Sequence, residues 1–209
     1  MLTSYRLRSC TAIIGLWRYD SYYEKFSDNS IRCIDEEIPY ELPKNWEWTR
    51  LGSVLNIVMG QSPSGNSVTN NGIGKEFHQG KIYFGDKYLN HSDQVTSKPS
   101  KLAPMNSVLL CVRAPVGKIN ITEREVCIGR GLAAIAPITD ISVDYIYIML
   151  KNYELDFLSK STGSTFSAIS IDVIKNALIP IPPLQEQTRI VNAVQIIMEK
   201  ISNIDCNIT

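Results

Sequence analysis

The sequence predicts an α/β (α+β) protein, in which a mixed β-sheet packs against helices and one long helix follows at the C-terminus. Three observations support this prediction. Short segments rich in Val and Ile between residues 107 and 138 are typical of strands separated by turns. Residues 142–157 place apolar side chains at helical spacing instead. Residues 187–204 repeat apolar side chains every three or four positions, as a long amphipathic helix does.

The composition indicates a folded domain without a membrane span. Of the 209 residues, 44% are hydrophobic and 20% are charged, which is ordinary for a globular protein. No apolar run approaches the ~20 residues that cross a bilayer. The N-terminal apolar stretch is short and lacks the cleavage pattern of a signal peptide. Five widely spaced cysteines without a C-x-x-C pair predict reduced thiols in a cytoplasmic chain.

The N-terminal third consists of three segments that differ in sequence pattern. Residues 1–37 show no steady period and end in an acidic cluster, so we expect a weakly ordered leader there. Trp46 and Trp48 then alternate with polar residues, as on one face of a strand. Residues 60–74 are crowded with Gly, Ser and Asn, which predicts a long loop. Loops longer than ~12 to 15 residues are uncommon in compact domains unless they are functional or disordered.

The middle and C-terminal parts predict regular structure. Ser142 is the expected N-cap of a helix with one buried face, and Ser170 is expected to open a shorter helix. Pro183 suits the first position of the last helix, where Glu186 complements the helix dipole. Strands are expected at residues 107–112, 118–122, 126–128, 132–138 and 177–181.

The last helix carries an apolar stripe at coiled-coil spacing, over about three heptads. An apolar stripe on a projecting helix requires a partner, either a second copy or another helix. The alternative is an amphipathic helix that packs on its own domain. The residues expected in a partner or dimer contact are Ile190, Val194, Ile197, Ile201 and Ile204.

Charge is distributed unevenly although the formal net charge is zero. Residues 60–131 carry nine Lys and Arg against five Asp and Glu, whereas the segments on either side carry a slight negative excess. Because clustered positive charge displaces the counterions of DNA, the middle segment is the candidate for phosphate contact. An ordinary solvated surface is the alternative interpretation.

Several sequence blocks occur in an order that resembles a known family. They are Tyr22-Tyr23-Glu24-Lys25-Phe26, Glu37-Ile38-Pro39-Tyr40, Trp46-Glu47-Trp48, Gly60-Gln61-Ser62-Pro63, Arg113-Ala114-Pro115-Val116-Gly117, Gly129-Arg130-Gly131-Leu132, Gly163-Ser164-Thr165-Phe166 and Pro182-Pro183-Leu184-Gln185-Glu186-Gln187. The ordered set resembles the specificity subunit of type I restriction-modification enzymes, as one target recognition domain followed by one conserved helix.

The resemblance implies a non-catalytic subunit that reads one half of a split double-stranded DNA target. Such a subunit binds no cofactor or metal itself. It directs DNA to methyltransferase subunits, which carry S-adenosylmethionine, and to a translocating endonuclease subunit. On this basis we expect a leader over residues 1–37, a DNA target recognition domain over 38–182 and a dimerisation or spacer helix over 183–209.

The chain departs from the family pattern because its length suffices for one recognition domain and one helix, where the family has two of each. The expectation is a half-size subunit that forms a homodimer, since a two-fold dimer reads two equal half-sites. The alternative is a truncated fragment that docks on methyltransferase or intact specificity subunits without reading DNA.

Candidate DNA contacts follow from side-chain chemistry, because base edges need paired donors and acceptors whereas phosphates need charge or N–H groups. For base reading we expect Gln61, Asn66, Asn70, Asn71, Lys75, Gln79 and Lys81. For phosphates we expect Lys98, Lys101, Arg113, Lys118 and Arg130. Ser164 and Thr165 are expected to offer hydroxyls or amides to a phosphate, or else to form a turn that seats Phe166.

Catalytic signatures are missing from the sequence. His78 and His91 lack metal-ligand spacing, and we interpret both as surface or DNA-facing residues. The chain contains neither a phosphate-binding G-x-x-x-x-G-K-[ST] loop nor a G-x-S-x-G elbow. We therefore expect no catalytic residue and no metal site.

Overall fold

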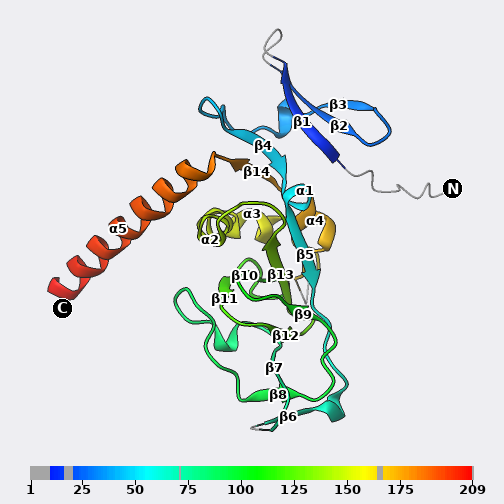
Figure 1. Ribbon diagram of the computed structural model, residues 1–209, viewed down its shortest axis with the longest axis vertical. Helices are drawn as coiled ribbons and strands as arrows, with labels where there is room; N and C mark the ends of the chain where they lie inside the picture. The colour runs from blue at the N-terminus through cyan, green and yellow to red at the C-terminus, as the bar shows by residue number, and fades with distance from the viewer. Residues whose placement is uncertain (1–9, 17–20, 71, 164–166, 209) are drawn as a thin grey trace.

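A computed structural model describes residues 10–16, 21–70, 72–163 and 167–208 (Figure 1). The molecule is elongated, with a small N-terminal sheet at one end, a central sheet with helices, and a second sheet at the other end. Helix α5 (Leu184–Ile208) projects away from this body. The architecture confirms the predicted α/β class, with mixed sheets and a long C-terminal helix.

The central sheet is antiparallel, with the order β11-β10-β13-β5. Its strands are β11 (Ile119–Thr122), β10 (Ser107–Cys111), β13 (Leu132–Pro137) and β5 (Leu55–Met59). Every residue of β10 is buried, because both faces of this strand are covered. Val108 and Leu110 point into the core beneath the helices, whereas Leu109 and Cys111 point into a second core on the opposite face.

Helices cover one face of the central sheet. They are α1 (Leu51–Val54), α2 (Val143–Asn152), α3 (Glu154–Ser159) and α4 (Ile171–Lys175). The predicted caps are confirmed, since the Ser142 side chain accepts a hydrogen bond from Tyr145 N and that of Ser170 from Val173 N. Leu150 and Phe157 are fully buried on the apolar face of this layer. Burying each such side chain contributes about 1.5–3 kcal/mol.

The second sheet has the order β6-β8-β7-β12-β9 and provides the far end of the molecule. Its strands are β6 (Val68–Asn70), β8 (Gln94–Thr96), β7 (Lys75–His78), β12 (Val126–Ile128) and β9 (Leu102–Ala103). Strands β7 and β12 run parallel, which makes the sheet mixed. The loop predicted over residues 60–74 differs from the structure, because it contains a 3-10 turn (Gly65–Ser67) and β6.

The N-terminal segment contains regular structure that the expectation of a weakly ordered leader did not include. Strands β1 (Cys10–Leu16), β2 (Ser21–Phe26) and β3 (Ile31–Cys33) form an antiparallel sheet. A buried guanidinium joins this sheet to the domain, since Arg50 donates to Glu24, Glu37 and the carbonyl of Asn176. Arg50 ends β4 (Glu47–Arg50), which pairs with β14 (Leu178–Ile181).

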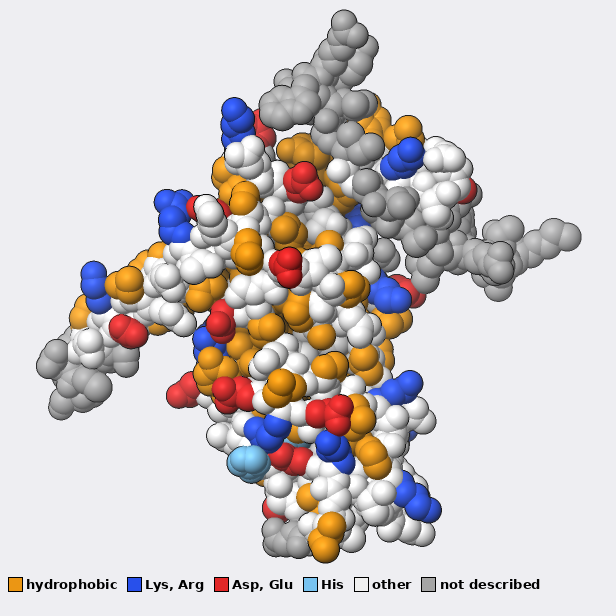
Figure 2. All heavy atoms as spheres, viewed as in Figure 1, with side chains coloured by type: hydrophobic (Ala, Val, Ile, Leu, Met, Phe, Trp, Pro, Cys, Tyr) orange, Lys and Arg blue, Asp and Glu red, His pale blue; other side chains and the backbone are white. Residues whose placement is uncertain are grey.

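Helix α5 is fixed to the domain by its first turns. Gln187 is 2% exposed; its Nε2 donates to the carbonyl of Pro182 at 3.1 Å and its Oε1 accepts from Ser142 N at 2.9 Å. Val191 is buried too, but Ile197, Ile201 and Ile204 are about half exposed. Figure 2 shows hydrophobic side chains along this projecting helix. Within the described residues, no helix has both the length and the apolar character that a membrane span requires.

Candidate nucleic-acid interface

Three glycines bring three loops into direct contact at the edge of the central sheet. A Cβ on Gly60 would lie 2.2 Å from the carbonyl oxygen of Gly129, and one on Gly131 would lie 2.4 Å from that of Gln79. Backbone hydrogen bonds fix the same contact, since Gly60 N donates to Leu132 O at 2.9 Å and Gly129 N to His78 O at 2.8 Å. The loops after β5, after β7 and between β12 and β13 therefore form one rigid unit.

Polar side chains gather on this unit and on the neighbouring Lys101, and we define the rim as Gln61, Ser62, Gln79, Lys101 and Arg130. Gln61 N donates to Ile128 O at 3.0 Å, and its carbonyl accepts from the Ser100 hydroxyl. Ile128 N in turn donates to Lys101 O at 2.9 Å. The rim side chains are exposed except for the half-buried Ser62. The rim thus presents amide and cationic groups, which are the groups that bind base edges and phosphates.

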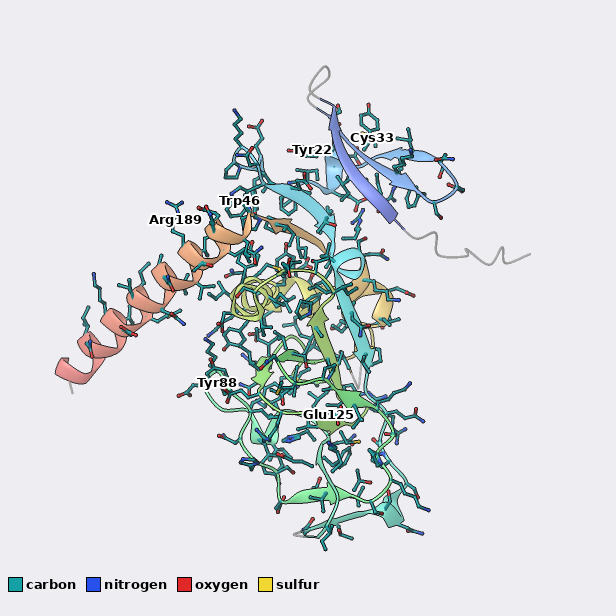
Figure 3. All side chains as sticks on the ribbon, in the orientation of Figure 1. Tyr22, Cys33, Trp46, Tyr88, Glu125 and Arg189 are labelled. Atoms are coloured by element: carbon teal, nitrogen blue, oxygen red, sulfur yellow. The ribbon has the colours of Figure 1, made fainter. Side chains whose placement is uncertain are left out.

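The cations between residues 60 and 131 divide into two classes. Four are neutralised by carboxylates at 2.6–2.8 Å, in the pairs Lys75–Glu125, Lys87–Asp144, Lys118–Glu154 and Arg124–Glu76. Among the described residues, the other five have no carboxylate within ion-pair distance: Lys81, Lys98, Lys101, Arg113 and Arg130. All five are exposed. Lys75 and Lys118 are therefore already paired, and Figure 3 shows Glu125, the partner of Lys75, in the part of the molecule that holds the second sheet.

The other residues predicted to contact DNA lie outside the rim. Arg113 follows Val112, whose N–H donates to Gly131 O at 2.9 Å, so Arg113 borders the rim. Asn66 and Asn70 are exposed, in the 3-10 turn and in β6 of the second sheet. Asn71, Ser164 and Thr165 lie outside the described residues.

A partly buried polar network on β7, the strand that leads to Gln79, was not predicted from the sequence. The Glu76 carboxylate accepts from Arg124 at 2.6 and 2.7 Å, from Ser92 N at 2.8 Å and contacts His78 Nε2 at 2.9 Å. Arg124 also donates to the carbonyls of Leu89 and Asn90. The network therefore fastens the loop before β8 to β7, the strand that ends at the rim.

Burial and hydrogen bonding shift the pKa values of this network. Burial raises the pKa of the Glu76 carboxyl, but the hydrogen bonds from Arg124, Ser92 and His78 outweigh burial and lower that pKa to about 2. Burial lowers the pKa of His78, although the neighbouring carboxylate opposes this. The interpretation of His78 as a surface or DNA-facing residue was wrong, because its side chain is 0% exposed. His91 is 83% exposed, as a surface residue should be.

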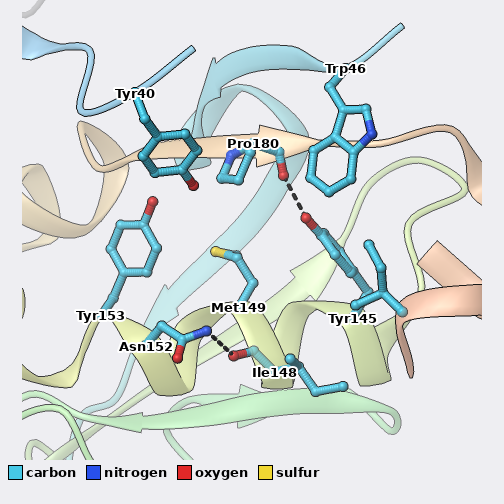
Figure 4. Close-up of a pocket in the computed structure, with 9 residues that line it drawn as sticks. Tyr40, Trp46, Tyr145, Ile148, Met149, Asn152, Tyr153 and Pro180 are labelled. Carbon is cyan, nitrogen blue, oxygen red and sulfur yellow. Dashed lines mark hydrogen bonds between the residues drawn. The ribbon is translucent and has the colours of Figure 1, made fainter. Parts of the chain in front are cut away.

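An aromatic pocket of about 190 Å³ lies beside the start of α5 (Figure 4). Tyr40, Trp46, Tyr145 and Tyr153 contribute to its walls. The Tyr145 hydroxyl donates to Pro180 O at 2.8 Å. The residues that line it include no Lys, Arg, Asp or Glu, so the pocket has no charged group for phosphate contact. Among the described residues, no three His, Cys, Asp or Glu side chains lie close enough to hold a metal ion.

Comparison with known proteins identifies relatives of one kind. Residues 43–207 match the model of the type I restriction modification DNA specificity domain. The MjaX type I restriction enzyme specificity subunit of Methanocaldococcus jannaschii is 38% identical over 156 residues, which is 72% of this chain and 36% of the relative. The EcoR124I/EcoR124II specificity subunit of Escherichia coli is 27% identical over 78% of this chain and 42% of its own length.

Solved structures show the same likeness. The HsdS subunit of Thermoanaerobacter tengcongensis superposes with a TM-score of 0.72 at 36% identity, covering 81% of this chain and 41% of that one. The type I S subunit from M. genitalium has a TM-score of 0.59 at 19% identity, over 80% of this chain and 43% of that one, and supports the fold alone. The chain thus spans about two fifths of the length of these relatives. Their names as specificity subunits agree with the expectation of a non-catalytic role.

Proposed function

Because the chain belongs to the type I restriction-modification specificity family, we propose that it reads one half-site of double-stranded DNA through the rim and the cations around it. The observation that carries this proposal is the grouping of two exposed glutamines with Lys101 and Arg130 on loops held by close glycine contacts. A rigid scaffold with exposed donors and unpaired cations suits direct readout, because little order must be gained on binding.

We further propose that α5 supplies the partner contact, with the chain acting as a half-size unit that pairs with a second copy. The half-exposed Ile197, Ile201 and Ile204 support this, because a projecting helix gains stability by burying such a stripe. The assembled subunit would direct methyltransferase subunits, which carry S-adenosylmethionine, and through them the endonuclease subunit to the DNA. It would do so in the cytoplasm. The domain division at residues 37 and 182 belongs to this proposal.

The salt dependence of binding tests DNA recognition against the rival of a protein-docking fragment. Binding of the full chain to its selected duplex and to a scrambled duplex is measured between 50 and ~200 mM salt, a range chosen because phosphate-mediated affinity changes steeply within it. We expect log affinity to fall linearly with log salt for both duplexes, with a slope of roughly −0.9 per phosphate contact, and the selected duplex to bind more tightly throughout. Absence of binding to either duplex at the lowest salt would instead favour the docking fragment.

A further inference from the structure

The side-chain amide of Gln79 is anchored at its oxygen. The Ser62 hydroxyl donates to Gln79 Oε1 at 2.9 Å. A Cβ on Gly129 would lie 2.2 Å from the same oxygen, so Oε1 occupies the space left by the missing side chain. Within the described part of the chain, no hydrogen bond joins Gln79 Nε2 to another residue, and Gln79 is exposed. The oxygen of the amide therefore faces the protein and its nitrogen is available to solvent.

Ser62 is itself held in place. Both backbone polar groups of the preceding residue, Gln61, are hydrogen-bonded. Its N–H donates to Ile128 O, and its carbonyl accepts from the Ser100 hydroxyl. Gly60 N donates to Leu132 O at 2.9 Å. Because the backbone leading to Ser62 is fixed at three points, its hydroxyl stays within reach of Gln79.

We propose that Gln79 reads DNA as a hydrogen-bond donor only, and that Ser62 is the positioning residue that sets this polarity. The inference rests on the proposed function. In the major groove guanine offers two acceptors, N7 and O6, adenine offers N7 and thymine offers O4, whereas cytosine offers only its N4 donor. A donor-only Gln79 favours guanine and excludes cytosine at its position. It also loses the bidentate contact with adenine, which needs the amide oxygen to face the base.

Selection from a randomised duplex library tests this inference with the full chain and three variants. For the wild type we expect one position of the enriched motif to favour guanine and to be depleted of cytosine. Gln79→Glu replaces the donor by an acceptor, so the preference at that position should move to cytosine by at least several-fold. Ser62→Ala frees the amide to rotate, so adenine should gain several-fold there. Gln195→Glu makes the same change as Gln79→Glu at an exposed position of helix α5, outside the rim, and serves as the matched control, with the wild-type motif retained.

The outcomes separate the donor role of Gln79 from DNA reading by the chain as a whole. If the wild type selects a motif but Gln79→Glu leaves every position of it unchanged, the donor role is overturned while DNA reading stands. If Gln79→Glu shifts the preference and Ser62→Ala does not, Gln79 reads DNA without Ser62 as its positioning residue. If the wild type enriches no motif, both the inference and the proposed function fail.

Discussion

Individual cations in this protein differ in what they offer to DNA, because some already have a carboxylate partner. Arg113 is exposed and has no ion pair among the described residues, whereas Lys118 Nζ lies 2.7 Å from Glu154 Oε1. Both were predicted phosphate contacts on residue type alone. The structure therefore ranks Arg113 above Lys118, since a paired ammonium gains less from a phosphate.

Replacing these two residues gives a matched comparison. Arg113→Ala should weaken binding to all duplexes alike and reduce the slope of log affinity against log salt by about 0.9. Lys118→Ala should change the slope less, because its charge is already compensated. Titrations of a selected and a scrambled duplex at several salt concentrations measure both slopes. Equal slopes for the two variants would show that the ion pair with Glu154 does not matter in solution.

The Glu76–His78 network predicts loss of stability in acid. The lowered pKa of Glu76 stabilises the fold above the unfolded value near 4.5, and this contribution disappears as pH falls toward 2. His78 acts in the same direction, since below about pH 6.5 the unfolded chain takes up a proton that the buried ring resists. The free energy of unfolding should thus fall from pH 7 to pH 4.

Urea titrations of the wild type and of His78→Gln test the histidine part. A group that binds a proton only in the unfolded state contributes up to about 1.4 kcal/mol per pH unit. His78→Gln should remove that slope between pH 6.5 and 5 and leave the slope below pH 4.5, to which Glu76 contributes. An unchanged slope between pH 6.5 and 5 would argue against a buried neutral imidazole.

At the scale of elements, the three-loop contact depends on glycine. Gly131→Ala would bring a Cβ to 2.4 Å from the backbone oxygen of Gln79, so the loop must move. We expect a loss of about 1–3 kcal/mol of stability together with weaker discrimination between selected and scrambled duplexes. Gly65→Ala is the control, because nothing lies within 4 Å of its Cβ. In thermal unfolding and duplex competition, Gly65→Ala should show wild-type stability and wild-type discrimination. A Gly131→Ala protein of wild-type stability would contradict the tight contact.

Helix α5 predicts self-association through its exposed stripe. Ile197→Asp combined with Ile201→Asp should abolish self-association, since both side chains are about half exposed and would otherwise be buried against a partner. Asn192→Asp combined with Gln195→Asp adds the same charge to exposed positions outside the stripe and should leave association intact. Sedimentation velocity measures the mass of each pair of variants. A wild-type chain that is monomeric at high concentration would contradict the pairing.

Local patterns predicted the elements well and their assembly poorly. The strands at residues 107–138, the Ser142 and Ser170 caps and the last helix follow from periodicity and capping chemistry, which are properties of neighbouring residues. The ion pairs of Lys75 with Glu125 and of Lys118 with Glu154 join residues far apart in the chain, so no local pattern reveals them. The N-terminal strands were missed because their residues show no steady alternation, although β1 and β2 are longer than the predicted β12.

In the proposed function, the molecule divides two tasks along its length. The rim lies where the central and second sheets meet, at the end of β5 and the start of β13. The aromatic pocket and the first turns of α5 lie against α2 and the β4–β14 pair (Figure 1). The proposed DNA contact and the proposed partner contact would therefore use different surfaces.

A map of DNA methylation in cells that co-express this chain with its cognate methyltransferase subunit would show whether the chain reads DNA as a pair of copies. We expect one modified palindromic motif that disappears when the chain is omitted, because two copies read equal half-sites. The motif should also change when Gln79→Glu replaces the wild type. Unmodified DNA, with both proteins present and folded, would contradict sequence-specific DNA reading by this chain.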